Sequence, residues 1–280
     1  ADERVVAEEL DRALQNIALR LDRGRQGLVV ATGPVGGEYA RFVESLRPRS
    51  TDWAVKAVNT DGSVANAFLV DAGDARFGIV QSDVAAAAVT GTGSFTGSGP
   101  LGRLRAVAAL FPEPLHVVVR ASDDIASVAD LAGRRVAVGQ RESGTRPLAQ
   151  EVLRAHGIGA DGYVPVNAAS PGEALQMLAD GRVDAVIEVV SAPWQQLGQV
   201  AAGTPLRLLP LAPEAMAGID GTVPGLLSLA IAARTYPGQD TPVLTVGATT
   251  LLLANSEVPE ASVRRVLEFL FEADVAADRG

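Results

Sequence analysis

The amino-acid sequence predicts an α/β fold with largely parallel sheets, divided between two lobes. The first observation is the alternation of short apolar segments, typical of buried strands, with segments of helical periodicity. The second is length, because 280 residues suffice for two domains that each have their own hydrophobic core. The third is that a single open sheet holding all of the expected strands would be large.

The expected elements follow one another with short connections. Strands are expected at 28–32, 53–58, 76–81, 134–139, 161–166, 183–190 and 206–211, and helices at 37–46, 63–70, 83–89, 145–156, 171–180 and 192–201. The Gly/Ser-rich segment 91–102 is typical of a loop. A strand at 115–124 is expected to enter the second lobe, and a strand at 245–256 with a final helix belongs to the first. These elements predict a first lobe of 27–114 and 212–280 and a second lobe of 115–211.

An additional helix is expected at the N-terminus, within residues 1–26. Apolar residues recur there at helical spacing, namely Val6, Leu10, Leu14, Ile17 and Leu21. The stripe is narrow, as in a coiled-coil seam, and too short to be stable as an isolated helix in water. The segment is therefore expected either to pack on its own domain or to form a stalk that pairs with a second copy as a dimer.

Composition excludes several classes of function. The formal net charge is −9 and Lys56 is the only lysine, so we expect no nucleic-acid partner. The absence of cysteine excludes disulfides, cysteine-based zinc sites and thiol catalysis. No apolar run reaches the length of a membrane span, and the first residues do not form a signal peptide. The chain is therefore expected to be cytoplasmic, or to have lost a targeting or anchoring segment.

The sequence shows no catalytic constellation. The two histidines, His116 and His156, lie in an apolar strand and at a helix end, without acidic or hydroxyl partners at a recognisable spacing. No nucleophile elbow, phosphate-binding loop or paired metal-ligand motif occurs. We therefore expect a protein that is not an enzyme and that has no cofactor and no metal.

A recurrent pattern is a strand that ends in hydroxyl or glycine residues and then leads into a helix. Such ends place cap hydroxyls and free N–H groups at the carboxyl edge of a sheet, where open α/β sheets bind their ligands. The residues concerned are Thr32 with Gly36 and Gly37, Ser63, Ser82 with Asp83, Ser143 with Gly144 and Thr145, and Ser191. Their distribution over two lobes predicts two walls of a ligand-binding cleft.

The chain resembles the TAXI group of solute-binding proteins, which serve TRAP-type transporters. The resemblance rests on segments found in order over residues 27–275, namely "ATGPVGGEY", "NTDGSVAN", "GIVQSDVA", "LFPEPLHVVVR", "VADLAGRRVAVGQRESGT", "LADGRVDAVIEVVSAPW" and "TYPGQDTPVLTVG". It implies a type II periplasmic binding protein fold whose lobes close on an amino acid or small organic acid, such as glutamate or the dicarboxylate 2-oxoglutarate. It further implies a periplasmic location and delivery to a membrane permease. Within these segments, Tyr39 and Tyr236 complete the expected ligand-binding set.

Several residues depart from the pattern expected of that group. Glu38, Arg141, Glu188 and Arg234 stand where small or apolar residues are usual. If Glu38 or Glu188 faced the ligand, it would repel a dicarboxylate. The extra N-terminal segment also favours an alternative function, in which the chain is the ligand-sensing extracytoplasmic domain of a receptor tethered to the membrane through a fused segment.

Overall fold

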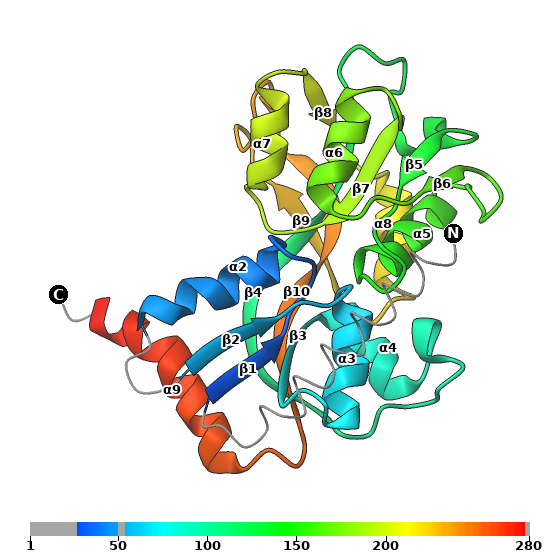
Figure 1. Ribbon diagram of the computed structural model, residues 1–280. Helices are drawn as coiled ribbons and strands as arrows, with labels where there is room; N and C mark the ends of the chain where they lie inside the picture. The colour runs from blue at the N-terminus through cyan, green and yellow to red at the C-terminus, as the bar shows by residue number, and fades with distance from the viewer. Residues whose placement is uncertain (1–26, 50–53, 278–280) are drawn as a thin grey trace, which may run out of the picture. The chain divides into compact units, whose positions relative to one another are not determined.

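The computed structural model describes residues 27–49 and 54–277, which form two compact units (Figure 1). Unit 1 contains the described residues up to 80, together with 101–109 and 251–277, and unit 2 contains 81–100 and 110–250. Two long strands, β4 (Leu104–Arg120) and β10 (Val243–Asn255), contribute residues to both units. The helix expected within residues 1–26 lies outside the described residues.

Unit 1 is built on parallel strands in the order β2-β1-β3. The strands are β1 (Gly27–Ala31), β2 (Ala54–Val58) and β3 (Phe77–Gln81). The helices are α2 (Glu38–Leu46), α3 (Ser63–Ala72) and α9 (Glu260–Ala277). A short 3-10 turn, Arg47–Arg49, follows α2. These strands and helices lie close to the ranges that the sequence predicts.

Packing in unit 1 follows from the apolar pattern of its elements. Helix α2 buries Tyr39, Ala40, Val43 and Leu46, which recur at helical spacing, and the helix packs against β2. Helix α3 packs against β1 and approaches β3 closely, because a side chain at Gly78 would meet Val70 at 2.7 Å. Every residue of β3 is buried, as expected for a strand covered on both faces.

Unit 2 contains a mixed sheet in the order β4-β7-β5-β6, with β8 paired to β4 and β9 paired to β10. Its other strands are β5 (Arg135–Ala137), β6 (Val164–Val166), β7 (Ala185–Val189), β8 (Leu206–Leu208) and β9 (Leu226–Ile231). Its helices are α4 (Ser82–Thr90), α5 (Thr145–Ala155), α6 (Pro171–Ala179), α7 (Gln195–Ala201) and α8 (Pro213–Asp220). Short 3-10 turns occur at Gly93–Phe95 and Val128–Leu131. Strands β5, β6 and β7 are parallel, whereas β4 is antiparallel to β7.

Two hydrophobic cores cover the two faces of the unit 2 sheet. One core contains Leu115, Val117 and Val119 of β4 together with apolar residues of α5 and α8. The other contains Val118 of β4 together with apolar residues of α6 and α7. Side chains alternate between the two faces of a strand, so the odd-numbered residues of β4 contact one core and Val118 contacts the other. Helices α5 and α8 therefore lie on one face of the sheet and α6 and α7 on the other, as Figure 1 shows.

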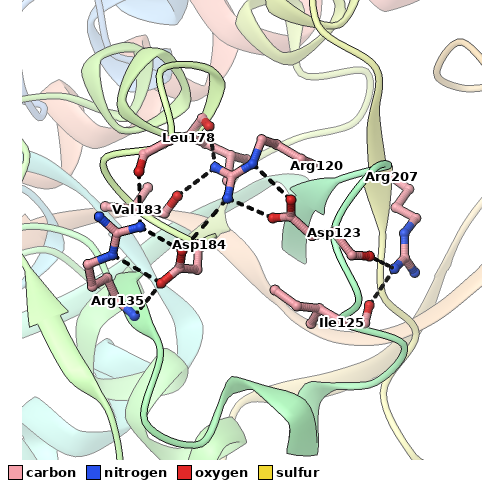
Figure 2. A network of polar contacts seen from close by, with 9 residues as sticks. Arg120, Asp123, Ile125, Arg135, Leu178, Val183, Asp184 and Arg207 are labelled. Carbon is pink, nitrogen blue, oxygen red and sulfur yellow. Dashed lines mark hydrogen bonds and ion pairs between the residues drawn. The ribbon is translucent and has the colours of Figure 1, made fainter.

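An ion-pair network joins the end of β4 to the starts of β5 and β7 (Figure 2). Asp184 pairs with Arg135 at 2.7 Å and with Arg120 at 3.7 Å, and Arg120 also pairs with Asp123 at 2.7 Å. Arg120 donates further to the carbonyls of Leu178 and Val183. The hydrogen bond from Arg135 is the main reason that the pKa of Asp184 lies below its usual range. The network therefore fixes the sheet edge opposite the carboxyl ends of β5 and β7.

The structure corrects two sequence-based expectations. Strand β4 begins at Leu104 and ends at Arg120, whereas a strand was expected at 115–124, because Pro112 and Pro114 weaken the strand pattern before them. The expected loop at 91–102 is confirmed, with a short 3-10 turn at Gly93–Phe95 within it. Helix α8 and strand β9 were not expected at all.

The expected lobe boundaries differ from the two compact units over 81–100, 110–114 and 212–250, which include α4, α8 and β9. The sequence assigns these residues to the first lobe, whereas they belong to unit 2. The reason is that Met216 and Ile219 of α8 join the core beside α5, and β9 pairs antiparallel with β10 from Leu226 to Ile231. Within residues 27–49 and 54–277, no helix is both long and apolar enough to cross a bilayer.

We predict that Asp184→Asn lowers the free energy of unfolding by about 1–3 kcal/mol at pH 7, because it weakens bonds to two arginines. The folded-state pKa of Asp184 is depressed, so this contribution is present above the carboxyl's unfolded pKa of about 4 and is lost as pH falls through the folded value. Urea unfolding of both proteins should show the difference shrinking in acid. The control, Glu260→Gln, alters an exposed ion pair with Arg264 and should change stability little. A constant difference across pH would contradict the prediction.

Candidate functional site

The first group of candidate residues lies at the carboxyl edge of the unit 1 sheet. Thr32 directly follows β1, and the turn through Gly36 and Gly37 leads into α2. Gly36 has a φ of 70°, which glycine adopts without strain. Ser63 begins α3 after β2. Since β1 and β2 are parallel neighbours, both helices begin at the same edge.

The strand order makes this edge a natural binding position. From β1 the chain continues to β2 on one side, and β3 lies on the other side of β1. Ligands of open α/β sheets bind outside the carboxyl ends of strands at such a reversal. The side chains of Thr32, Tyr39 and Ser63 are buried, and the Thr32 hydroxyl donates to the carbonyl of Val58 at 3.0 Å. Residues 34–37 of the turn are therefore the more exposed part of this edge.

The side chain of Asn66 joins the three strands of unit 1 at this edge. Its amide group donates to the carbonyl of Thr32, which follows β1, and to that of Ile79 in β3 at 2.7 Å. Its Oδ1 accepts from the hydroxyl of Thr60, which follows β2, at 2.6 Å. Asn66 is completely buried. Sequence reasoning did not identify this residue, although it lies in the quoted segment "NTDGSVAN".

The second group of candidates begins α4 in unit 2. The Ser82 hydroxyl donates to the carbonyl of Gly225 at 2.6 Å and accepts from the backbone N–H of Thr249 at 2.8 Å. Gly225 has a φ of 90°, and a side chain there would meet the Ser82 carbonyl at 2.6 Å. Ser82 thus holds the turn before β9 against α4.

Asp83, the next residue, is a buried carboxyl group in the first turn of α4. The backbone N–H groups of Val84 and of Asp83 itself favour the charged form of this carboxyl group and lower its pKa. Its Oδ1 is buried and has no hydrogen-bond partner among the described residues. Burial raises the pKa of Asp83 to about 6, against the lowering effect of the two N–H groups.

The third group lies at the carboxyl edge of β5 and β7. Gly144 precedes α5, which begins at Thr145, and Ser191 follows β7. The Thr145 hydroxyl donates to Oε1 of Glu188 at 2.7 Å and accepts from the N–H of Val189 at 3.2 Å. Thr145 and Glu188 are both buried. Because β5 and β7 are parallel neighbours, the structure brings these residues to one edge.

Arg146 holds the loop that carries Ser143. Its guanidinium donates to the carbonyls of Gly139 and Gln140 and to Oδ1 of Asn167 at 2.6 Å. The Ser143 hydroxyl donates to the carbonyl of Gln140 at 2.8 Å and accepts from the N–H of Arg146 at 3.3 Å. The charge of Arg146 is therefore directed to the loop's own carbonyls. The sequence contained no signal for this role, since an arginine in a first helical turn is usually solvated.

Tyr236 belongs to a buried chain of hydrogen bonds in unit 2. The carbonyl of Pro114 can only accept, so Nδ1 of His116 carries the proton in their 2.9 Å bond. Nε2 of His116 then accepts from the Tyr236 hydroxyl at 2.7 Å, and that hydroxyl accepts from the backbone N–H of Trp194 at 2.8 Å. Burial lowers the pKa of His116 to about 4, which keeps the ring neutral. Tyr236 therefore positions the chain after β7.

Tyr236 also contributes to a pocket of about 140 Å³ beside α7 and β8. The residues that line it include Val118, Leu197, Val243 and the segment 237–241. Val118 pairs with Val186 near the start of β7, whereas Ser191 follows the end of that strand. The pocket is therefore separate from the edge that carries Thr145.

The residues that depart from the TAXI pattern have different environments. Arg234 is exposed and has a φ of 64°, a conformation that favours glycine, and its N–H donates to the carbonyl of Gln239 at 2.7 Å. Arg141 is exposed, and Glu38 is half-buried in the first turn of α2. Among the described residues, no cluster of histidine, aspartate and glutamate could hold a metal ion.

Comparison with known proteins supports the fold and a family. The model of the NMT1-like family matches residues 30–277. The alkanesulfonate-binding protein SsuA from Xanthomonas axonopodis pv. citri, bound to MOPS, is 19 % identical and has a TM-score of 0.56, with 91 % of this chain and 75 % of that chain covered. The periplasmic aliphatic sulphonate binding protein SsuA from Escherichia coli is 18 % identical, with a TM-score of 0.53 and coverage of 91 % and 74 %.

A further similar structure is an ancestral arginine-binding protein bound to arginine. It is 14 % identical and has a TM-score of 0.52, and the match covers 91 % of this chain and 96 % of that chain. These likenesses establish the two-lobed type II periplasmic binding protein fold that the sequence predicts. The family match supports the wider group of binding proteins and does not single out the TAXI group.

We predict that Asn66→Ala lowers the free energy of unfolding by roughly 2–4 kcal/mol, because buried carbonyls at two strand ends lose their donors. Urea unfolding followed by circular dichroism measures this loss. Ser45→Ala, which removes an exposed hydroxyl on α2, is the matched control and should change stability by less than about 0.5 kcal/mol. Equal stabilities of the two variants would show that Asn66 does not hold the strand ends.

We also predict that His116 makes the protein sensitive to acid. Its folded pKa of about 4 lies below the usual 6.5, so stability is lost as pH falls from 6.5 towards 4. A depression of this size corresponds to about 3 kcal/mol. His116→Gln removes the titration, so its stability relative to the wild type should rise over that interval in unfolding experiments. A stability difference that stays constant between pH 7.5 and 4 would contradict the assignment.

Proposed function

Because this chain belongs to the NMT1-like family, we propose that it is an extracytoplasmic solute-binding protein. The observation that carries the proposal is the position of the candidate residues. Apart from Tyr236, which follows the antiparallel strand β9, they lie at carboxyl ends of parallel strands, where helices α2, α3, α4 and α5 begin. This arrangement supplies many neutral donors to a small polar molecule.

The proposed solute is an amino acid or a small organic acid of the size of glutamate or 2-oxoglutarate. Thr32, Gly36, Gly37, Tyr39 and Ser63 form the half-site of unit 1. The half-site of unit 2 consists of Ser82, Asp83, Ser143, Gly144, Thr145, Ser191 and Tyr236. Of these, Tyr236 and Ser82 act through the backbone that they hold in place. We propose that each half-site supplies polar contacts to the solute.

The proposed partner is a TRAP-type permease in the membrane, to which the protein delivers its solute from the periplasm. The alternative is a ligand-sensing domain tethered to the membrane. Reconstitution of a TRAP-type permease in proteoliposomes distinguishes the two, because uptake of the solute should require this protein only if it serves transport. A dimer through residues 1–26 stays a prediction, which analytical ultracentrifugation with and without that segment tests.

We predict that one class of small polar solute raises the melting temperature, whereas NAD and ATP do not. A ligand at a hundredfold excess over its Kd stabilises the folded state by about 2.7 kcal/mol. For a chain of this size, that corresponds to several degrees in a thermal-shift assay. A screen in which only nucleotides shift the transition, or in which no amino acid or organic acid does, would refute the proposed function.

We further predict that Ser143→Ala weakens binding of the solute found in that screen about tenfold or more. Loss of the hydroxyl releases the carbonyl of Gln140 and loosens the loop before α5. Isothermal titration calorimetry measures the affinity, and Thr96→Ala, an exposed hydroxyl in the turn after Phe95, is the control. Unchanged affinity in Ser143→Ala would remove this loop from the site.

A further inference from the structure

Three of the helices that begin at candidate edges already have a carboxyl group at their N-terminus. In α4 the carboxyl group is Asp83, which lies in the first turn of the helix. At the start of α5, the Thr145 hydroxyl donates to Glu188 at 2.7 Å. In α2, Glu38 occupies the first turn. The positive ends of these helix dipoles thus face carboxyl groups of the chain itself.

This arrangement opposes the binding of anions. A helix N-terminus attracts an anionic ligand through its partial positive charge and its free N–H groups. A second carboxylate brought to α4 or α5 would meet the charge of Asp83 or Glu188 in a partly desolvated environment, where repulsion is stronger than in water. Arg146 does not compensate, because its guanidinium is bound to the carbonyls of Gly139 and Gln140.

Asp83 is an ionisable side chain with one oxygen that lacks a partner, whereas Gln140 and Thr250, which also have a buried oxygen without a partner among the described residues, are neutral. Oδ1 of Asp83 is buried without a hydrogen bond from any described residue. The side chains of Ser82 and Thr145, by contrast, both donate and accept. Leaving a buried acceptor unsatisfied is costly, so such a group is retained where it serves another purpose. A primary ammonium group supplies three donors and the opposite charge.

We propose that the solute carries an ammonium group and that the carboxylate of Asp83 is its ion-pair partner. This inference rests on the proposed solute-binding function and narrows the solute to amino acids and related amines. Glu188, held by Thr145, disfavours a second carboxylate at α5, so a monocarboxylic amino acid binds better than a dicarboxylate.

Matched pairs of solutes test this inference. Each pair differs only at one group, with ammonium in one member and hydroxyl or oxo in the other, such as leucine with its 2-hydroxy analogue, or glutamate with 2-oxoglutarate. Thermal shift and calorimetry should show at least thirtyfold tighter binding of the amino members of the pairs. Tighter binding of the hydroxy or oxo acids would overturn the inference and leave the proposed function intact. Absence of binding by every member would overturn both.

Asp83→Asn supplies the test at the residue. The substitution keeps the shape and removes the charge, so affinity for the amino member should fall about a hundredfold, while affinity for its hydroxy analogue should not fall. Asp161→Asn, an exposed carboxyl group of unit 2, is the control and should bind as the wild type does. Circular dichroism establishes folding, and Asp83→Glu, which retains the charge, should recover part of the affinity. Equal affinity of Asp83→Asn and the wild type for the amino member would contradict the inference.

Discussion

The candidate edge of unit 1 depends on the buried amide of Asn66. Parallel strands have no hairpin to fix their ends, so something else must hold the turns that follow them. Asn66 does this for all three strands, through the carbonyls of Thr32 and Ile79 and the hydroxyl of Thr60. A side chain without an amide group could not donate twice and accept once from one position. These hydrogen bonds therefore hold the turn that leads into α2 in position.

In unit 2, hydroxyl groups and a neutral histidine hold the strand ends and the turns that follow them. Thr145 joins α5 to β7, Ser82 joins α4 to the strands beside it, and the Tyr236 hydroxyl connects His116 to the chain after β7. Since these groups are satisfied within the unit, they give the site its shape. Asp83 combines an ionisable carboxyl group with a buried oxygen that has no partner among the described residues, and this combination is the reason to assign Asp83 a role in binding.

The charges at the candidate site distinguish between possible solutes better than the shape of the fold does. The type II periplasmic binding protein fold is compatible with sulfonates and with arginine in the similar structures, so the fold alone does not select a ligand. In this chain, the carboxyl groups at α2, α4 and α5 compensate the helix dipoles that would otherwise favour anions. An ammonium-bearing solute is the class that these groups favour.

The sequence by itself determined the α/β class, most of the parallel strands and the strand ends that carry hydroxyl and glycine residues, because these follow from local periodicity and turn chemistry. It did not predict β9 and α8, whose positions depend on pairing with β10 and packing beside α5. It also gave no sign of Asn66, Arg146 or the bond between Thr145 and Glu188. The hydrogen bonds concerned join residues distant in the chain, such as Thr145 and Glu188. They form only when the sheet brings the strand ends together. Only the tertiary structure decided which polar groups are satisfied and which, Asp83 among them, keep a buried oxygen without a hydrogen-bond partner among the described residues.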